Sequence, residues 1–131
     1  MKTKLRDKEQ GQALVEFALI LPILLLLLFG IVEFGRIYSA SLIVKQGARE
    51  GARVASLGMT DTEIVTKVQG SALALDIAKL TVYITPALAD RKRGQDVQVV
   101  VGYSVTVVAP FISAITGPTV NVNGASVMRM E

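Results

Sequence analysis

The side chains best suited to chemistry in the C-terminal half of the sequence are its carboxylates, and their spacing pairs none of them in a catalytic motif. They are Asp61, Glu63, Asp76, Asp90, Asp96 and Glu131. Asp61 and Glu63 follow Thr60 at capping-box spacing, which predicts the start of a helix, where anions are favoured.

The chain has no Cys and no His, which excludes thiol and imidazole nucleophiles, thiolate zinc sites and disulfides. The sequence also contains neither a G-x-S-x-G motif nor a phosphate-binding loop. We therefore expect no enzyme activity, no cofactor, no metal and no small-molecule substrate.

The net charge of +3 belongs to one part of the chain. Residues 1–57 carry eight Lys or Arg and five Asp or Glu, whereas residues 58–131 carry six of each. The second part lacks the basic face that nucleic-acid binding requires, so no nucleic-acid partner is expected. Hydrophobic residues make up 51% of the chain but aromatic residues only 5%, so the apolar excess is aliphatic.

This excess is concentrated around an uncharged run of sixteen residues, Phe17 to Val32. Extended back to Ala13, the run as a helix would span about 30 Å, the thickness of a bilayer core. The four cations of residues 1–11 predict a cytoplasmic N-terminus. We predict a single-pass membrane protein with an extracytoplasmic C-terminal domain.

A cleaved secretory signal is the rival interpretation of this run, since small residues at 39–41 resemble a cleavage site. It is disfavoured because the run is long for such a signal. Glu33 and Arg36 also separate the run from the small residues.

A helical pattern without proline continues past the apolar run to Leu57, and Gly58 is a suitable C-cap. One helix over residues 12–57 would be about 70 Å long. Pro22 cannot donate a backbone hydrogen bond to Ala18, which predicts a kink. The GAREGAR repeat places small residues on one helix face, at Gly47, Ala48, Gly51 and Ala52. This small-residue stripe would pack on a partner helix or on the chain's own sheet, and we favour the sheet.

The remainder, residues 58–131, has the pattern of a small α+β head domain, which follows a leader (1–11) and the membrane helix with its extension (12–57). The pattern predicts an amphipathic helix over 61–78, strands over 80–85 and 96–108, and a last strand within 117–130. The strands would form an antiparallel sheet on which the outer half of the long helix packs. Residues 86–95 read as a polar loop with an exposed Arg-Lys-Arg at 91–93, and Gly124 reads as a bulge.

The sequence GQALVEF, at 11–17, gives the apolar run a distinctive start, because Gly11 ends the charged leader and Glu16 is the fifth residue counted from Gln12. This is the layout of a class III, or type IV-like, prepilin. Further motifs within residues 10–57 are G-x-A-x-V-E-F-A-L-x-L-P, the leucine run, E-x-G-R-x-Y and A-R-E-G-A-R. Together they resemble the TadE-like proteins of the tight-adherence (Tad, or Flp) pilus system.

The resemblance implies a minor pilin or pseudopilin of the bacterial cytoplasmic (inner) membrane that a prepilin peptidase trims between Gly11 and Gln12. Its partners would be other pilin or minor pilin subunits and the Tad secretion machinery, in assembly or initiation of an adhesive pilus. A glycine suits close approach of a protease because it has no side chain, although Gly11 also reads as a flexible entry to the helix.

Glu16 and Phe17 read as an assembly motif, because a carboxylate at the edge of a membrane span needs a partner. Trimming would give Gln12 a cationic amine near the same depth, and this amine would pair with Glu16 of a neighbouring subunit. The alternative is that Glu16 only extends to the membrane interface.

Two further functions stay open at this point. One is an uncleaved, membrane-tethered module that binds an envelope ligand through the 86–95 loop. The other is a principal filament subunit. Processing of the leader separates the tethered module from both kinds of pilin.

Overall fold

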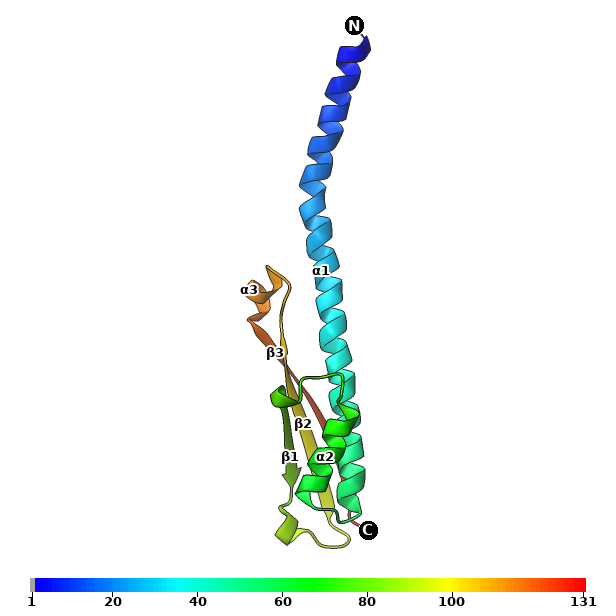
Figure 1. The fold of residues 1–131 in the computed structure, drawn as a ribbon, viewed down its shortest axis with the longest axis vertical. Helices are drawn as coiled ribbons and strands as arrows, with labels where there is room; N and C mark the ends of the chain where they lie inside the picture. Colours follow the sequence, from blue (N-terminus) through cyan, green and yellow to red (C-terminus); the bar gives the residue numbers. More distant parts are fainter. Residues whose placement is uncertain (1) are drawn as a thin grey trace.

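A long helix with a small head at one end makes up the computed structural model, which describes the backbone of residues 2–131 and the side chains of residues 11–131 (Figure 1). The helix, α1, spans Lys2–Ser56 and runs through Pro22 without interruption. Figure 1 shows a gentle curve along it. Its C-terminal end is closed by Gly58, which has φ +80° and donates its N–H to the Ala55 carbonyl at 3.0 Å, as the sequence predicted.

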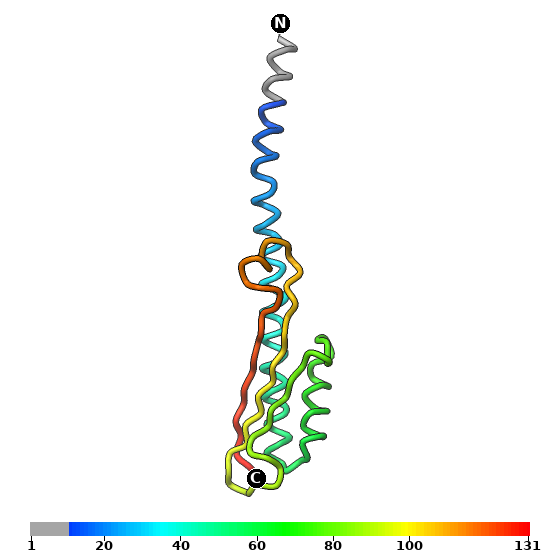
Figure 2. The backbone as a smooth tube through the Cα atoms, turned by 90° about the vertical axis from the view of Figure 1, so that its left-hand side faces the viewer, coloured from blue at the N-terminus to red at the C-terminus, as the bar shows by residue number. Residues whose placement is uncertain are grey.

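The head contains a helix and a three-stranded antiparallel sheet in the order β1-β2-β3, which confirms the predicted α+β class. Its elements are α2 (Asp61–Ser71), η1 (Ile77–Lys79), β1 (Leu80–Thr85), η2 (Leu88–Asp90), β2 (Asp96–Thr106), α3 (Ile112–Thr116) and β3 (Thr119–Arg129). Figures 1 and 2 show the sheet running alongside the C-terminal half of α1, with the C-terminus at the end of the molecule farthest from the N-terminus.

The outer half of α1 completes the core of the head, as predicted. The inward face of β2 alternates through Val97, Val99, Val101 and Val105, all buried. Small side chains of α1 cover them, at Ala40, Val44, Ala48, Ala52 and Ala55, and α2 adds Ile64 and Val68. Each helix residue is small because the helix lies close to the sheet.

Two predicted elements end earlier than expected. The helix predicted over 61–78 stops at Ser71, and the chain turns before η1. Asp76 accepts a hydrogen bond from the Ala78 N–H at 3.1 Å, and this local capping competes with a continued helix. The strand predicted over 96–108 stops at Thr106, and the structure adds a short helix, α3, that the pattern did not predict.

The predicted bulge at Gly124 is wrong, because the β2–β3 register runs without interruption from Asp96 opposite Arg129 to Thr106 opposite Thr119. Gly124 faces α1 instead. A Cβ there would lie 2.7 Å from the Lys45 Cα and 2.8 Å from the Val44 carbonyl oxygen. The glycine is needed for close approach of two backbones rather than for an irregular strand.

Candidate functional site

The N-terminal half of α1 carries the exposed apolar surface of the protein. Every residue from 11 to 29 is exposed. The Gly11–Ser56 segment contains a window of mean hydropathy 2.8 that is not buried. By length and composition this helix is able to cross a membrane, which is compatible with a single-pass membrane protein.

Gly11 and Gln12, the predicted processing site, lie within α1 rather than at its entrance. Among the described residues, nothing lies within 4 Å of a Cβ built on Gly11. The fold therefore does not require a glycine at this position. The charged side chains of the leader, residues 1–10, lie outside the described side chains.

Gln12 and Glu16 lie one helical turn apart on one exposed face. The Gln12 Nε2 atom donates a hydrogen bond to Glu16 Oε1 at 3.0 Å. Phe17 is exposed next to Glu16. The predicted motif thus forms a polar group at the start of the apolar surface, and the carboxylate accepts a bond from the residue at the predicted cut.

The small-residue stripe lies inside the head. Ala48 and Ala52 are fully buried. A Cβ on Gly51 would lie 2.7 Å from Val68 Cγ2 and 3.1 Å from Val99 Cγ1, so α2 and β2 both press on this face. Gly47 faces Val68 as well. The stripe is covered by the chain's own sheet and α2, which leaves it no surface for a partner helix.

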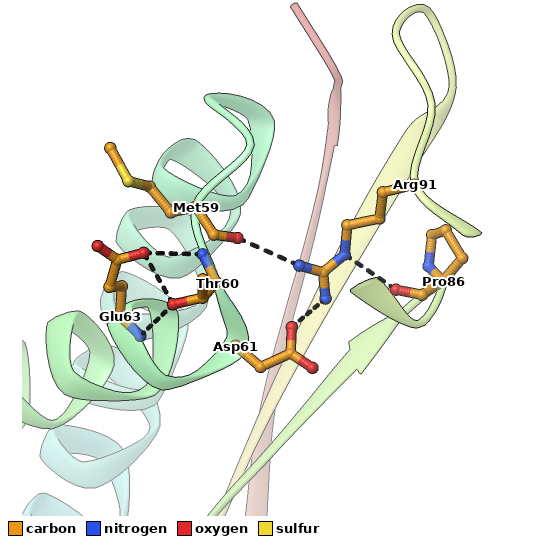
Figure 3. Close-up of polar contacts among 6 residues, drawn as sticks. All are labelled: Met59, Thr60, Asp61, Glu63, Pro86 and Arg91. Atoms are coloured by element: carbon orange, nitrogen blue, oxygen red, sulfur yellow. Dashed lines mark hydrogen bonds and ion pairs between the residues drawn. The ribbon is translucent and has the colours of Figure 1, made fainter. Parts of the chain in front are cut away.

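The prediction of an exposed Arg-Lys-Arg loop is wrong for its first residue. The side chain of Arg91 is 2% exposed and forms an ion pair with Asp61 (Figure 3). Its Nε donates to the Pro86 carbonyl at 3.0 Å, and its Nη1 donates to the Met59 carbonyl at 3.3 Å. Arg91 therefore joins the start of α2 to the loop after β1.

The predicted capping box is present at the same corner (Figure 3). Glu63 Oε2 accepts from the Thr60 backbone N–H and from Thr60 Oγ1, each at 2.8 Å. The backbone hydrogen bond first, and the hydroxyl second, lower the pKa of Glu63. Across the described residues, no group of three or more acidic side chains is arranged to hold a metal ion.

Sequence reasoning missed the structural role of Glu33 and Arg36, which it used only as charges that end the apolar run. Glu33 is buried and pairs with Arg36 Nη1 at 2.9 Å. Arg36 Nη2 donates to the Thr106 carbonyl at 3.4 Å. The signal was available in their i,i+3 spacing, which places them on one helix face. The pair connects the apolar half of α1 to the end of β2.

Comparisons with known proteins agree with these features. No match was found among curated proteins or among solved structures. Residues 11–53, which include the Gly11–Phe17 motif, the apolar surface and the small-residue stripe, are similar to the family described as TadE-like protein.

Proposed function

We propose that this protein is a minor pilin or pseudopilin of a Tad/Flp-type pilus, acting in assembly or initiation of a pilus used for adhesion. It crosses the cytoplasmic membrane once, with a cytoplasmic N-terminus and an extracytoplasmic head that becomes pilus-associated. The observation that carries the proposal is the TadE-like match over residues 11–53, which contains the prepilin-like motif on an exposed apolar helix. The role requires no catalysis, cofactor or nucleic acid.

The environment of Gly11 supports cleavage between Gly11 and Gln12 by a prepilin peptidase. Glycine inside a helix costs about 0.5–1 kcal/mol relative to alanine. Among the described residues nothing occupies the space that an alanine methyl group would fill. No contact among the described residues requires a glycine at this position. Close approach of a peptidase to the backbone would favour one, and this supports cleavage here.

The position of Glu16 supports a role in setting subunit height. Cleavage would create an amine on Gln12, whose side chain already bonds to Glu16 at 3.0 Å in the uncut chain. The new amine would lie about 6 Å along the helix from the depth of Glu16, because the two residues are four positions apart. A neighbouring subunit displaced by more than this would leave a carboxylate and an amine unpaired in lipid.

Mass spectrometry of the protein from cells with and without the prepilin peptidase tests the cleavage. The expected result is a chain starting at Gln12 only where the peptidase is present. The shortened chain would lose four cations and two anions, so its formal net charge would fall from +3 to +1. An intact chain in both strains would contradict the proposal and favour an uncleaved tether.

A Glu16→Leu variant tests the assembly step. It should insert in the membrane normally, since the change makes the span more apolar, but pilus formation should fall. Glu131→Leu is the matched control, because it removes an exposed carboxylate at the far end of the chain. Normal piliation with Glu16→Leu would refute the pairing. Abundance of the protein in sheared filaments would identify a principal subunit instead.

A further inference from the structure

The connection between β2 and β3 ends in an uncharged, apolar tip. Residues 107–118, VVAPFISAITGP, contain no charged side chain. Three large side chains there are not buried by the head, with exposed fractions of 70% for Val108, 70% for Phe111 and 85% for Ile115. Such a group of exposed apolar residues marks a surface that contacts something other than water.

The tip lies beside the apolar half of α1. Phe111 lines one hydrophobic groove with Leu25, Leu26 and Phe29. Ile112 Cδ1 would lie 3.9 Å from a Cβ built on Gly30. Figures 1 and 2 show the same placement, since the orange segment is the part of the head that extends farthest toward the N-terminus.

The depth of the tip follows from the rise of the helix. Phe29 and Leu25 precede Glu33 by four and eight residues. At 1.5 Å per residue, the groove that holds Phe111 lies about 6–12 Å below Glu33 along α1. Amphipathic elements that lie in a membrane interface are buried to about 5–10 Å. The tip is therefore at the depth of an interfacial element if Glu33 marks the membrane edge.

Two cations lie where the apolar tip begins. Arg36 Nη2 donates to the Thr106 carbonyl at 3.4 Å, and Lys79 Nζ donates to Thr106 Oγ1 at 3.0 Å. Thr106 is the last residue of β2. Cations at one level and bare apolar side chains just beyond it are the arrangement of a lipid interface, where phosphate groups lie above acyl chains.

The backbone conformation of Phe111 also supports a functional role for the tip. Its φ of +70° is rare for a bulky residue, and packing within the chain does not explain it, because the side chain is largely exposed. Strained residues that persist at an exposed position are a reason to look for function. Here the strained residue carries a largely exposed aromatic ring within the tip.

We propose that the 107–118 tip inserts into the outer leaflet of the membrane beside α1, with Arg36 and Lys79 at the level of the lipid phosphates. This inference rests on the membrane placement in the proposed function. A lipid occupant is favoured over a protein because the tip is continuous with the span: whatever surrounds residues 22–30 at that height also surrounds the tip. The insertion would hold the head against the bilayer until the subunit leaves it.

The absence of cysteine allows a clean test with single labelled positions. Ile115→Cys, labelled with an environment-sensitive fluorophore, is reconstituted in vesicles of phosphatidylcholine and phosphatidylglycerol that contain spin-labelled lipids. Leu25→Cys reports on the span. Val127→Cys is the matched control, since Val127 is apolar and 54% exposed but lies near the far end of β3. We expect several-fold stronger lipid quenching at 25 and 115 than at 127.

The two proposals fail in different ways in this experiment. Absence of quenching at 25 would refute the membrane placement itself. Quenching at 25 but not at 115 would refute the insertion alone. A probe at 115 that is shielded from water but not quenched by lipid would mean that a protein, such as a second copy, covers the tip, and this also overturns the inference.

A second pair of variants tests the insertion independently, in case labelling at position 115 misfolds the tip. Ile115→Asp, combined with a Val108→Cys label, should move the label from lipid into water, because a carboxylate is costly in the acyl region. Ile115→Leu with the same label should keep it in lipid. Equal quenching in both proteins would overturn the insertion.

Discussion

The contact between Gly124 and α1 provides the sharpest test of how the head is built. A Cβ at this position would lie 2.7 Å from the Lys45 Cα and 2.8 Å from the Lys45 N atom. Carbon atoms in favourable contact are about 3.5–4.0 Å apart, so Gly124→Ala requires helix and strand to separate by about 1 Å. Both obstacles are backbone atoms, so no side-chain rotation can relieve the clash.

The expected cost follows from two opposing effects. Overpacking of a well-packed core costs about 1–3 kcal/mol. Replacing a strand glycine by alanine returns about 0.5–1 kcal/mol through the unfolded chain. The net loss of head stability should be about 1–2 kcal/mol. Because 1.4 kcal/mol is a factor of ten in an equilibrium constant, amides of β2 and β3 should exchange about ten times faster.

Hydrogen–deuterium exchange of the full chain in detergent micelles measures this directly, peptide by peptide. Gly70→Ala is the matched control, since Gly70 lies in α2 with nothing within 4 Å of its Cβ among the described residues. That change should leave exchange of β3 unchanged and slow exchange in α2, because alanine is the better helix former. Unchanged exchange of β3 in Gly124→Ala would refute the close approach of helix and sheet.

Two further predictions concern the corner shown in Figure 3. Arg91→Met leaves the Met59 and Pro86 carbonyls without their donor and should lower the free energy of unfolding by about 1.5–3 kcal/mol. Arg93→Met, at an exposed neighbour, should change it by less than about 0.5 kcal/mol, and equal effects in thermal melts would contradict the buried role of Arg91. The hydrogen bonds from the Thr60 backbone N–H and hydroxyl hold the pKa of Glu63 below its ordinary value, so its contribution to stability is present at neutral pH and is lost as the pH falls through the lowered pKa. Thermal melts from pH 7 to pH 3 should therefore show Glu63→Gln less stable than wild type at pH 7, with a difference that shrinks as the pH falls; a constant difference would contradict this.

The sequence predicted an element correctly where a single strong local pattern determines its structure. Strand β1 was predicted with its observed bounds, Leu80–Thr85, because alternation of apolar and polar residues fits only one register. The capping box at Thr60 was found for a similar reason, since its residues interact locally. The fold class followed from these elements and from the long apolar helix.

The predictions were wrong where contacts between residues far apart in the sequence determine the structure. Arg91 sits in a run of three cations that reads as exposed, and only the fold brings Met59 and Pro86 within reach of it. Gly124 interrupts an apolar pattern, but whether a glycine marks a bulge or a close approach depends on what lies opposite. In this protein Lys45, seventy-nine positions earlier in the chain, lies opposite it.

The structure also explains how one helix can serve two environments. Its outer half packs in the head, where Ala48 and Ala52 are fully buried, whereas every residue of the segment 11–29 is exposed and accessible to lipid or to other subunits. Glu16 lies near the start of that segment, and Glu33 lies four residues beyond its end. They are seventeen residues apart, or about 26 Å along the helix, close to the thickness of a bilayer core.

The two carboxylates at these edges are in different chemical situations. Glu33 is buried with Arg36 as an internal partner. Glu16 is exposed and bonds only to the neutral side-chain amide of Gln12 among the described residues. Among the described side chains, Glu33 therefore has a cationic partner within the chain, whereas Glu16 has none. Under the proposed cleavage, a new amine at Gln12 would supply a cation near Glu16, so cutting the chain and assembling it would be coupled at Glu16 and not at Glu33.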